Sequence, residues 1–145
     1  MAITQAVCNS FKSEVLQEGH NLRTDTLKIA LYTSAASLSA GTAAYTSTNE
    51  VASSGSYAKG GGTLAGATIS LGGTSASGGT AIVDFTDKSF TSTTFSVRGA
   101  LIYNSSNSNK AVAVLNFGSD KVSTNGTFTI SFPAAAAATA IITLS

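Results

Sequence analysis

The period of the apolar residues changes near Asp25, and this change constrains the fold more than any other feature of the chain. Before Asp25, apolar residues recur every three or four positions, which is the period of a helix. After Asp25, they alternate with polar residues in short runs that are separated by Gly, Asn and Ser. One helical stretch followed by many alternating runs predicts a mainly β domain with a single N-terminal helix.

The first stretch predicts one amphipathic helix over residues 4–18. Thr4 is a suitable N-cap, and Gly19 is a suitable left-handed stop. Two roles for the apolar stripe remain open: it covers a face of the domain's own sheet, or it docks on a neighbouring subunit. The stripe comprises Ile3, Val7, Cys8, Phe11, Val15 and Leu16.

The remaining chain predicts an antiparallel β-sandwich or barrel of about seven to eight strands, because turn residues recur at the spacing of such folds. Residues 27–32 alternate cleanly and predict a half-buried strand. The best hairpin joins 99–103 to 111–117, and further turns are expected at residues 118–120 and 125–126. We expect one domain over 1–145, with a strand-rich body over 25–145. The other strands are expected at residues 64–71, 80–85, 89–97, 127–132 and 140–144.

Two segments do not follow the strand pattern. Residues 34–63 form a long loop or arm rich in Ser, Ala, Gly and Thr, and it exceeds an ordinary connection in length. We expect packing of its aromatic residues, on this chain or on a partner, to order it. Residues 134–138 are five alanines, which predict a tight loop or single helical turn, or alternatively a flat contact patch. The candidate interface residues are therefore Tyr45, Val51, Tyr57, Ala134, Ala135, Ala136, Ala137 and Ala138.

The composition offers few groups for catalysis. Only 10% of the 145 residues are charged, whereas Ser, Thr, Gly and Ala make up more than half. The single histidine, His20, follows the predicted helix, where an imidazolium would favour the helix dipole. The single cysteine, Cys8, lies in the apolar stripe and is most simply a small buried hydrophobe. We predict no catalytic, cofactor-binding or metal-binding residue, no cofactor and no enzymatic activity.

Charge and hydropathy also restrict the partners. The net charge of +1 gives no field to attract nucleic acid or an anionic membrane. No run approaches about 18 apolar residues, and the first ten residues lack the pattern of a signal peptide. A net charge near zero favours association, so we expect a homo-oligomer, either a dimer or a trimer.

Five stretches of the chain carry a family resemblance. Residues 2–16 (AITQAVCNSFKSEVL) resemble the opening of small structural proteins of tailed bacteriophages, including marine and cyanobacterial phages. The other stretches that are similar to this family are 26–34 (TLKIALYTS), 44–51 (AYTSTNEV), 98–104 (RGALIYN) and 111–121 (AVAVLNFGSDK). The resemblance extends along most of the chain and implies a virion component without enzymatic activity.

The leading hypothesis is a capsid cement (decoration) protein that clamps adjacent capsid subunits. Its partners would be the major capsid protein or other virion proteins, and it would be made in the host cytoplasm and carried in the virion. One alternative is a component associated with the neck, tail or fibres. Another is a β-sandwich that binds carbohydrate or a surface, with Tyr45, Tyr57 and Tyr103 as exposed stacking residues.

Overall fold

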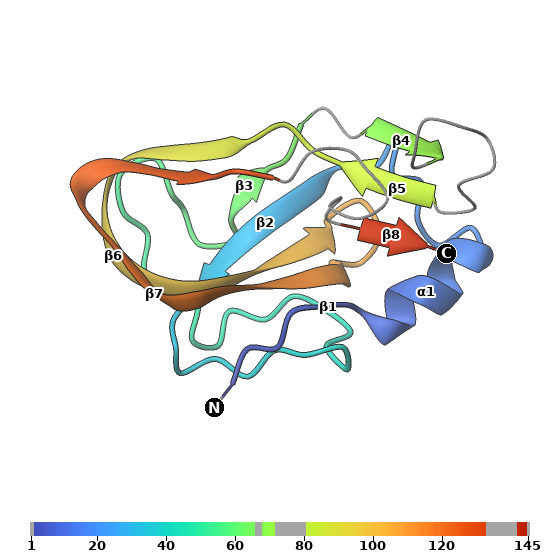
Figure 1. Cartoon of the computed structure of the whole chain (residues 1–145), viewed down its shortest axis with the longest axis horizontal. Helices are drawn as coiled ribbons and strands as arrows, with labels where there is room; N and C mark the ends of the chain where they lie inside the picture. The colour runs from blue at the N-terminus through green and yellow to red at the C-terminus, as the bar shows by residue number, and fades with distance from the viewer. Residues whose placement is uncertain (1, 66–67, 72–80, 133–141, 145) are drawn as a thin grey trace.

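A computed structural model describes residues 2–65, 68–71, 81–132 and 142–144. Over these residues the protein is mainly β, with two antiparallel sheets and one short helix (Figure 1). The larger sheet has the strand order β1-β7-β6-β2-β3, and the smaller has the order β4-β5-β8. The predicted mainly β, antiparallel class is confirmed. The larger sheet is open, with β1 and β3 at its two ends, so it does not form a closed barrel.

The described elements follow one another along the chain, and a long segment without named strands separates β2 from β3. The helix α1 spans Asn9–Leu16. The strands are β1 (Ala6–Val7), β2 (Leu27–Tyr32), β3 (Gly62–Thr63), β4 (Thr68–Leu71), β5 (Ala81–Asp84), β6 (Lys88–Asn104), β7 (Lys110–Ile130) and β8 (Ile142–Leu144).

The helix is shorter than the predicted residues 4–18. Its predicted first turn is instead strand β1, which pairs with Ala113 and Val114 of β7. Pairing with β7 gives the backbone N–H and C=O groups of β1 hydrogen-bond partners, so these residues do not need a helical turn to supply them. Cys8, with extended backbone, is therefore the N-cap in place of Thr4. At the other end Glu18 adopts the left-handed conformation (φ 60°) that was expected for Gly19.

The β6–β7 hairpin is the longest element and merges strands that the sequence predicts as separate. Residues 99–103 pair with 111–117 as expected, which confirms the best hairpin. The turns expected at 118–120 and 125–126 are instead irregularities inside β7, where Gly118 (φ 81°) and Asn125 (φ 46°) have positive φ and the register shifts. Such bulges bend a strand and increase its twist. The hairpin consequently curves at one end of the molecule, and its two halves lie one above the other in Figure 1.

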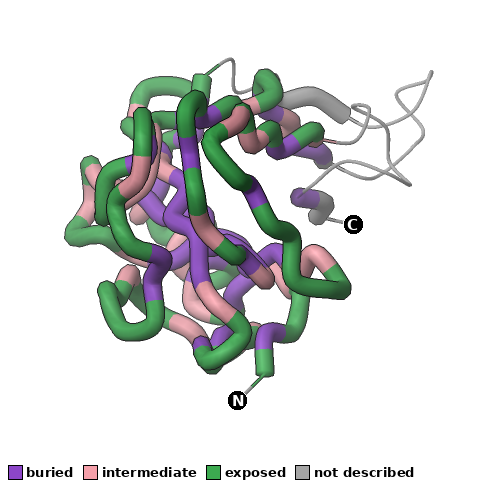
Figure 2. Tube along the Cα trace, turned by 90° about the vertical axis from the view of Figure 1, so that its left-hand side faces the viewer, coloured by how far each residue is buried: buried purple, intermediate pink, exposed green. Residues whose placement is uncertain are grey.

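Strand β2 lies between β6 and β3 in the larger sheet and is buried on both faces. The prediction of a half-buried strand is wrong, because Ala30 and Tyr32 are buried together with Ile29 and Leu31. Residues 34–63 pack against this strand: the Tyr32 hydroxyl donates to the Thr46 carbonyl at 2.6 Å. The buried residues run through the interior between the strands (Figure 2) and extend from α1 to β8 as one cluster. This single core is what an undivided domain requires.

The approach of residues 58–62 to β2 generates a testable prediction about two glycines with positive φ. A Cβ on Gly61 (φ 86°) would lie 2.0 Å from the Ile29 carbonyl oxygen, whereas one on Gly118 (φ 81°) would meet nothing within 4 Å. Gly118→Ala should cost about 1 kcal/mol of unfolding free energy, which is the backbone penalty alone. Gly61→Ala should cost more than about 3 kcal/mol, because the backbone must move as well. Denaturant unfolding of both variants measures the difference, and equal costs would contradict this packing.

Candidate functional site

A buried carboxylate organises the 34–63 segment. Glu50 is 6% exposed, and its side chain accepts three hydrogen bonds. The Tyr57 hydroxyl donates to Oε1 at 2.6 Å, and the Gly60 backbone N–H donates to the same oxygen at 2.7 Å. The Tyr45 hydroxyl donates to Oε2 at 2.6 Å. A carboxylate removed from water is costly unless donors of this kind replace its hydration.

All four tyrosines of the chain gather around this carboxylate. The Tyr57 hydroxyl also accepts a hydrogen bond from the Leu31 N–H at 2.9 Å, which connects Glu50 to β2. The rings of Tyr45 and Tyr103 stack with centroids 4.7 Å apart, which connects the segment to β6. The Tyr103 hydroxyl donates to the Gly60 carbonyl. We call Tyr32, Tyr45, Glu50, Tyr57, Gly60 and Tyr103 the tyrosine–Glu50 cluster.

Burial raises the pKa of each of these tyrosines, and the neighbouring Glu50 carboxylate raises it further. Each hydroxyl therefore stays protonated at neutral pH and acts as a hydrogen-bond donor. The cluster is consequently suited to holding the 34–63 segment on the sheet, rather than to transferring protons.

The structure places the sequence-predicted interface residues of this segment largely inside the protein. Tyr57 is 1% exposed, and Val51 is buried with its N–H bonded to the Leu31 carbonyl at 2.9 Å. Tyr45 is half-buried against Tyr103. Aromatic packing orders the segment as expected, and the surface it uses is this chain's own sheet. Val51 and Tyr57 therefore belong to the core in this conformation. Of the predicted interface residues in this segment, Tyr45 remains a candidate. Residues 134–138 lie outside the described residues.

The carbohydrate alternative required Tyr45, Tyr57 and Tyr103 to be exposed. That expectation is wrong for Tyr57 and Tyr103, which are both buried. The sequence-based reasoning also missed Glu50. The available signal was that Glu50 is the single acidic residue of the 34–63 segment, between two tyrosines.

His20 joins three parts of the fold. Its Nε2 lies 2.7 Å from Oε2 of Glu14 in α1, and its Nδ1 lies 3.0 Å from the amide nitrogen of Asn104 at the end of β6. The same amide nitrogen donates to Asp25 at 2.6 Å. Because the amide donates to Nδ1, the ring proton is on Nε2 and is donated to Glu14. Both ring nitrogens of His20 are therefore occupied by side-chain contacts.

Cys8 is fully buried at the start of α1, as predicted. Burial raises the pKa of its thiol to about 11, and the Glu14 carboxylate adds to this shift. The thiol is therefore protonated at neutral pH, and it behaves as a small hydrophobe and not as a nucleophile.

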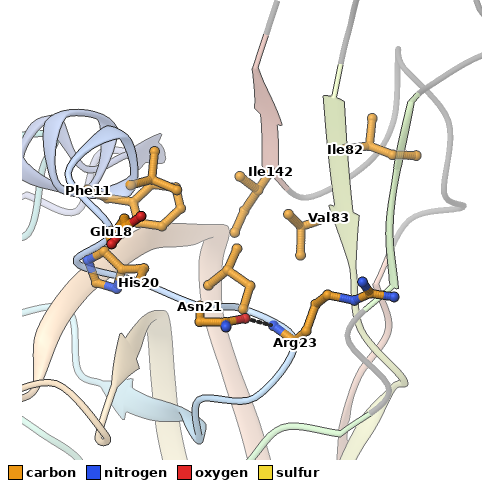
Figure 3. A pocket seen from close by; sticks show the side chains of 10 residues that line it. Phe11, Glu18, His20, Asn21, Arg23, Ile82, Val83 and Ile142 are labelled. Atoms are coloured by element: carbon orange, nitrogen blue, oxygen red, sulfur yellow. Dashed lines mark hydrogen bonds between the residues drawn. The ribbon is translucent and has the colours of Figure 1, made fainter.

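The surface of the described structure has hollows, of which two bear on function. The larger, with a volume of about 560 Å³, lies between α1, the loop that follows it, and strands β5 and β8 (Figure 3). It is lined by Phe11, Val15, Glu18, His20, Asn21, Leu22, Arg23, Ile82, Val83 and Ile142. The smaller is a groove of about 330 Å³ beside β7, which we call the β7 groove. It is lined by Phe117, Lys121, Phe128, Thr129, Ile130 and Ser131.

Comparison of the chain with protein-family models, with curated proteins and with solved structures finds no match. Within the described ranges, no three His, Cys, Asp or Glu side chains gather as a metal site would require. None of the helices in the same ranges has the length and apolar character needed to cross a membrane.

The raised tyrosine pKa values predict that stability falls at alkaline pH. Below about pH 9 the tyrosines are neutral in both the folded and unfolded states. Above pH 10 they ionise in the unfolded chain first, so each lowers the unfolding free energy by about 1.4 kcal/mol per pH unit until its folded pKa is reached. Urea unfolding at pH 8, 10 and 11 should show a modest loss over the first interval, to which ionisation of the Cys8 thiol in the unfolded chain contributes, and a steeper loss per pH unit over the second.

Two phenylalanine variants separate this effect from general alkaline damage. Tyr57→Phe should already cost about 2 kcal/mol at pH 8, because it leaves the Leu31 N–H without its acceptor. It should also show a shallower loss above pH 10. Tyr45→Phe, at the half-buried position, should cost about 1 kcal/mol. An unchanged alkaline slope in both variants would contradict the role of the cluster.

Proposed function

We propose that the protein is a non-enzymatic structural component of a tailed bacteriophage particle, most simply a capsid cement protein. It would bind adjacent capsid subunits and stabilise the shell. The observation that carries this proposal is that the buried polar side chains form structural hydrogen bonds between segments of the chain. Glu50, His20 and the tyrosines each fasten one segment of the chain to another.

The stretches that resemble phage structural proteins support the proposal by their positions. Residues 26–34 contain β2, and 98–104 and 111–121 lie in β6 and β7 beside it. Residues 44–51 contain Tyr45 and Glu50. The resemblance therefore falls on the central strands and on the cluster that holds the long segment against them.

The outward face of the curved hairpin suits a protein that makes many weak contacts. Its exposed positions are mostly hydroxyl residues: Ser89, Thr91, Thr94 and Ser96 of β6, and Thr124, Thr127 and Thr129 of β7. Small polar side chains offer hydrogen bonds without the desolvation cost of charges. Contacts that are individually modest suffice when a shell repeats them. If the protein binds the assembled shell and not the free subunits, its binding would stabilise the shell by mass action.

The proposal includes the finer features that the sequence predicts. The two layers of the molecule would act as a β-sandwich body, and the protein would self-associate as a dimer or trimer. Its partners would be the major capsid protein or other virion proteins. A position at the neck, tail or fibres is the alternative within the same class.

Quantitative mass spectrometry of purified particles of the virus that encodes the chain tests the proposal. The particles are washed at high salt to remove adsorbed protein, and the chain is counted against the major capsid protein with isotope-labelled peptides. We expect a copy number in proportion to the capsid subunits. A copy number that matches the low symmetry of the tail would instead indicate the neck or tail component. Absence of the chain from particles would overturn the proposal.

A further inference from the structure

The outer half of β7 is an edge of the larger sheet. Between Ser119 and Ile130, β7 pairs with β6 on one side, and the part of the chain that the structure describes gives it no backbone partner on the other. The corresponding edge of β6 is covered: the Ser56 N–H donates to the Thr91 carbonyl at 2.9 Å, and Ser54 Oγ accepts from the Thr94 N–H at 2.8 Å. As far as the described residues go, main-chain donors and acceptors on this side of β7 are therefore available to a partner.

The β7 groove opens beside this edge. The rings of Phe117 and Phe128 lie 6.1 Å apart, and both side chains are half-buried. Ile130 forms the buried part of the lining. Val122 lies in the same stretch of β7 outside the groove lining and is 72% exposed. The groove therefore presents apolar surface directly next to unpaired main-chain groups.

Lys121 supplies a positive charge to the lining of the groove. Its Nζ lies 3.0 Å from Ser119 Oγ, and no carboxylate in the described ranges comes within ion-pair distance of it. The adjacent Asp120 is already paired with Arg98 at 3.0 Å. The groove is therefore complementary to an apolar group that has a negative charge beside it.

We propose that the β7 groove and edge bind an extended segment of another protein, in which an apolar side chain stands next to an acidic one. The segment adds to the sheet through main-chain hydrogen bonds, its apolar side chain packs in the groove against the rings of Phe117 and Phe128, and its carboxylate pairs with Lys121. That the partner is a virion subunit rests on the proposed function. The binding surface itself does not depend on it.

The irregularities of β7 limit how long this segment is. Positive φ at Gly118 and Asn125 divides the free edge into two short stretches. Bulges of this kind protect an edge from indiscriminate strand pairing. The site therefore selects a short segment with matching side chains and discourages aggregation through long strands.

Nuclear magnetic resonance titration of the isolated protein tests the site without any virus particle. The probes are two short synthetic peptides, one alternating valine and phenylalanine with glutamate and the other alternating them with lysine. We expect the glutamate peptide to shift the amide resonances of residues 117–131 in a saturable way. The lysine peptide should bind at least about tenfold more weakly, because it repels Lys121.

Charge-reversal variants complete the test. Lys121→Glu should reverse the preference between the two peptides. Lys59→Glu, an equal charge change at an exposed position in the 34–63 segment, should leave it unchanged. Shifts confined to other parts of the protein, no saturable shift with either peptide, or the same effect from both variants would each overturn the proposal. Because no particle is involved, such a failure is distinct from the absence of the chain from virions.

Discussion

The burial of one carboxylate governs how the long segment between β2 and β3 folds. Glu50 enters the interior only because two tyrosine hydroxyls and a backbone N–H meet it there. Each of these donors is held in turn by β2, by β6 or by the tight approach at Gly61. Removing a charged group from water is unfavourable, so the donors and the carboxylate must arrive together. The cluster therefore makes residues 34–63 part of the core and not a free arm.

This constraint links the fold to the proposed role. A protein that binds adjacent capsid subunits benefits from loops that are already ordered, because ordering a loop on binding costs conformational entropy. The tyrosine–Glu50 cluster and the His20 contacts order the loops on either side of β2 in the free chain. What remains for a partner is the outward hydroxyl face and the free edge of β7. These surfaces carry few charges, in keeping with the composition.

The sequence predicts those parts of the fold that depend on neighbouring residues. Strand β2 and the hairpin around residues 104–109 follow from local alternation and turn chemistry, and the structure contains both. The predicted start of α1 is wrong because β1 pairs with β7, which lies far away in sequence. The irregularities at Gly118 and Asn125 look like turns locally, and only pairing with β6 makes them bulges. Glu50 was missed for the same reason, since its donors come together only in the folded chain.

Native-state hydrogen exchange tests the central claim most directly, because it reports whether residues 34–63 open independently of the sheet. The decisive amides are those of Gly60, which donates to Glu50, and Val51, which donates to the Leu31 carbonyl. If the cluster holds the segment in the core, these amides exchange as slowly as those in the middle of β2 and β6, through global unfolding. Exchange orders of magnitude faster than β2, with β2 itself still protected, would contradict this account.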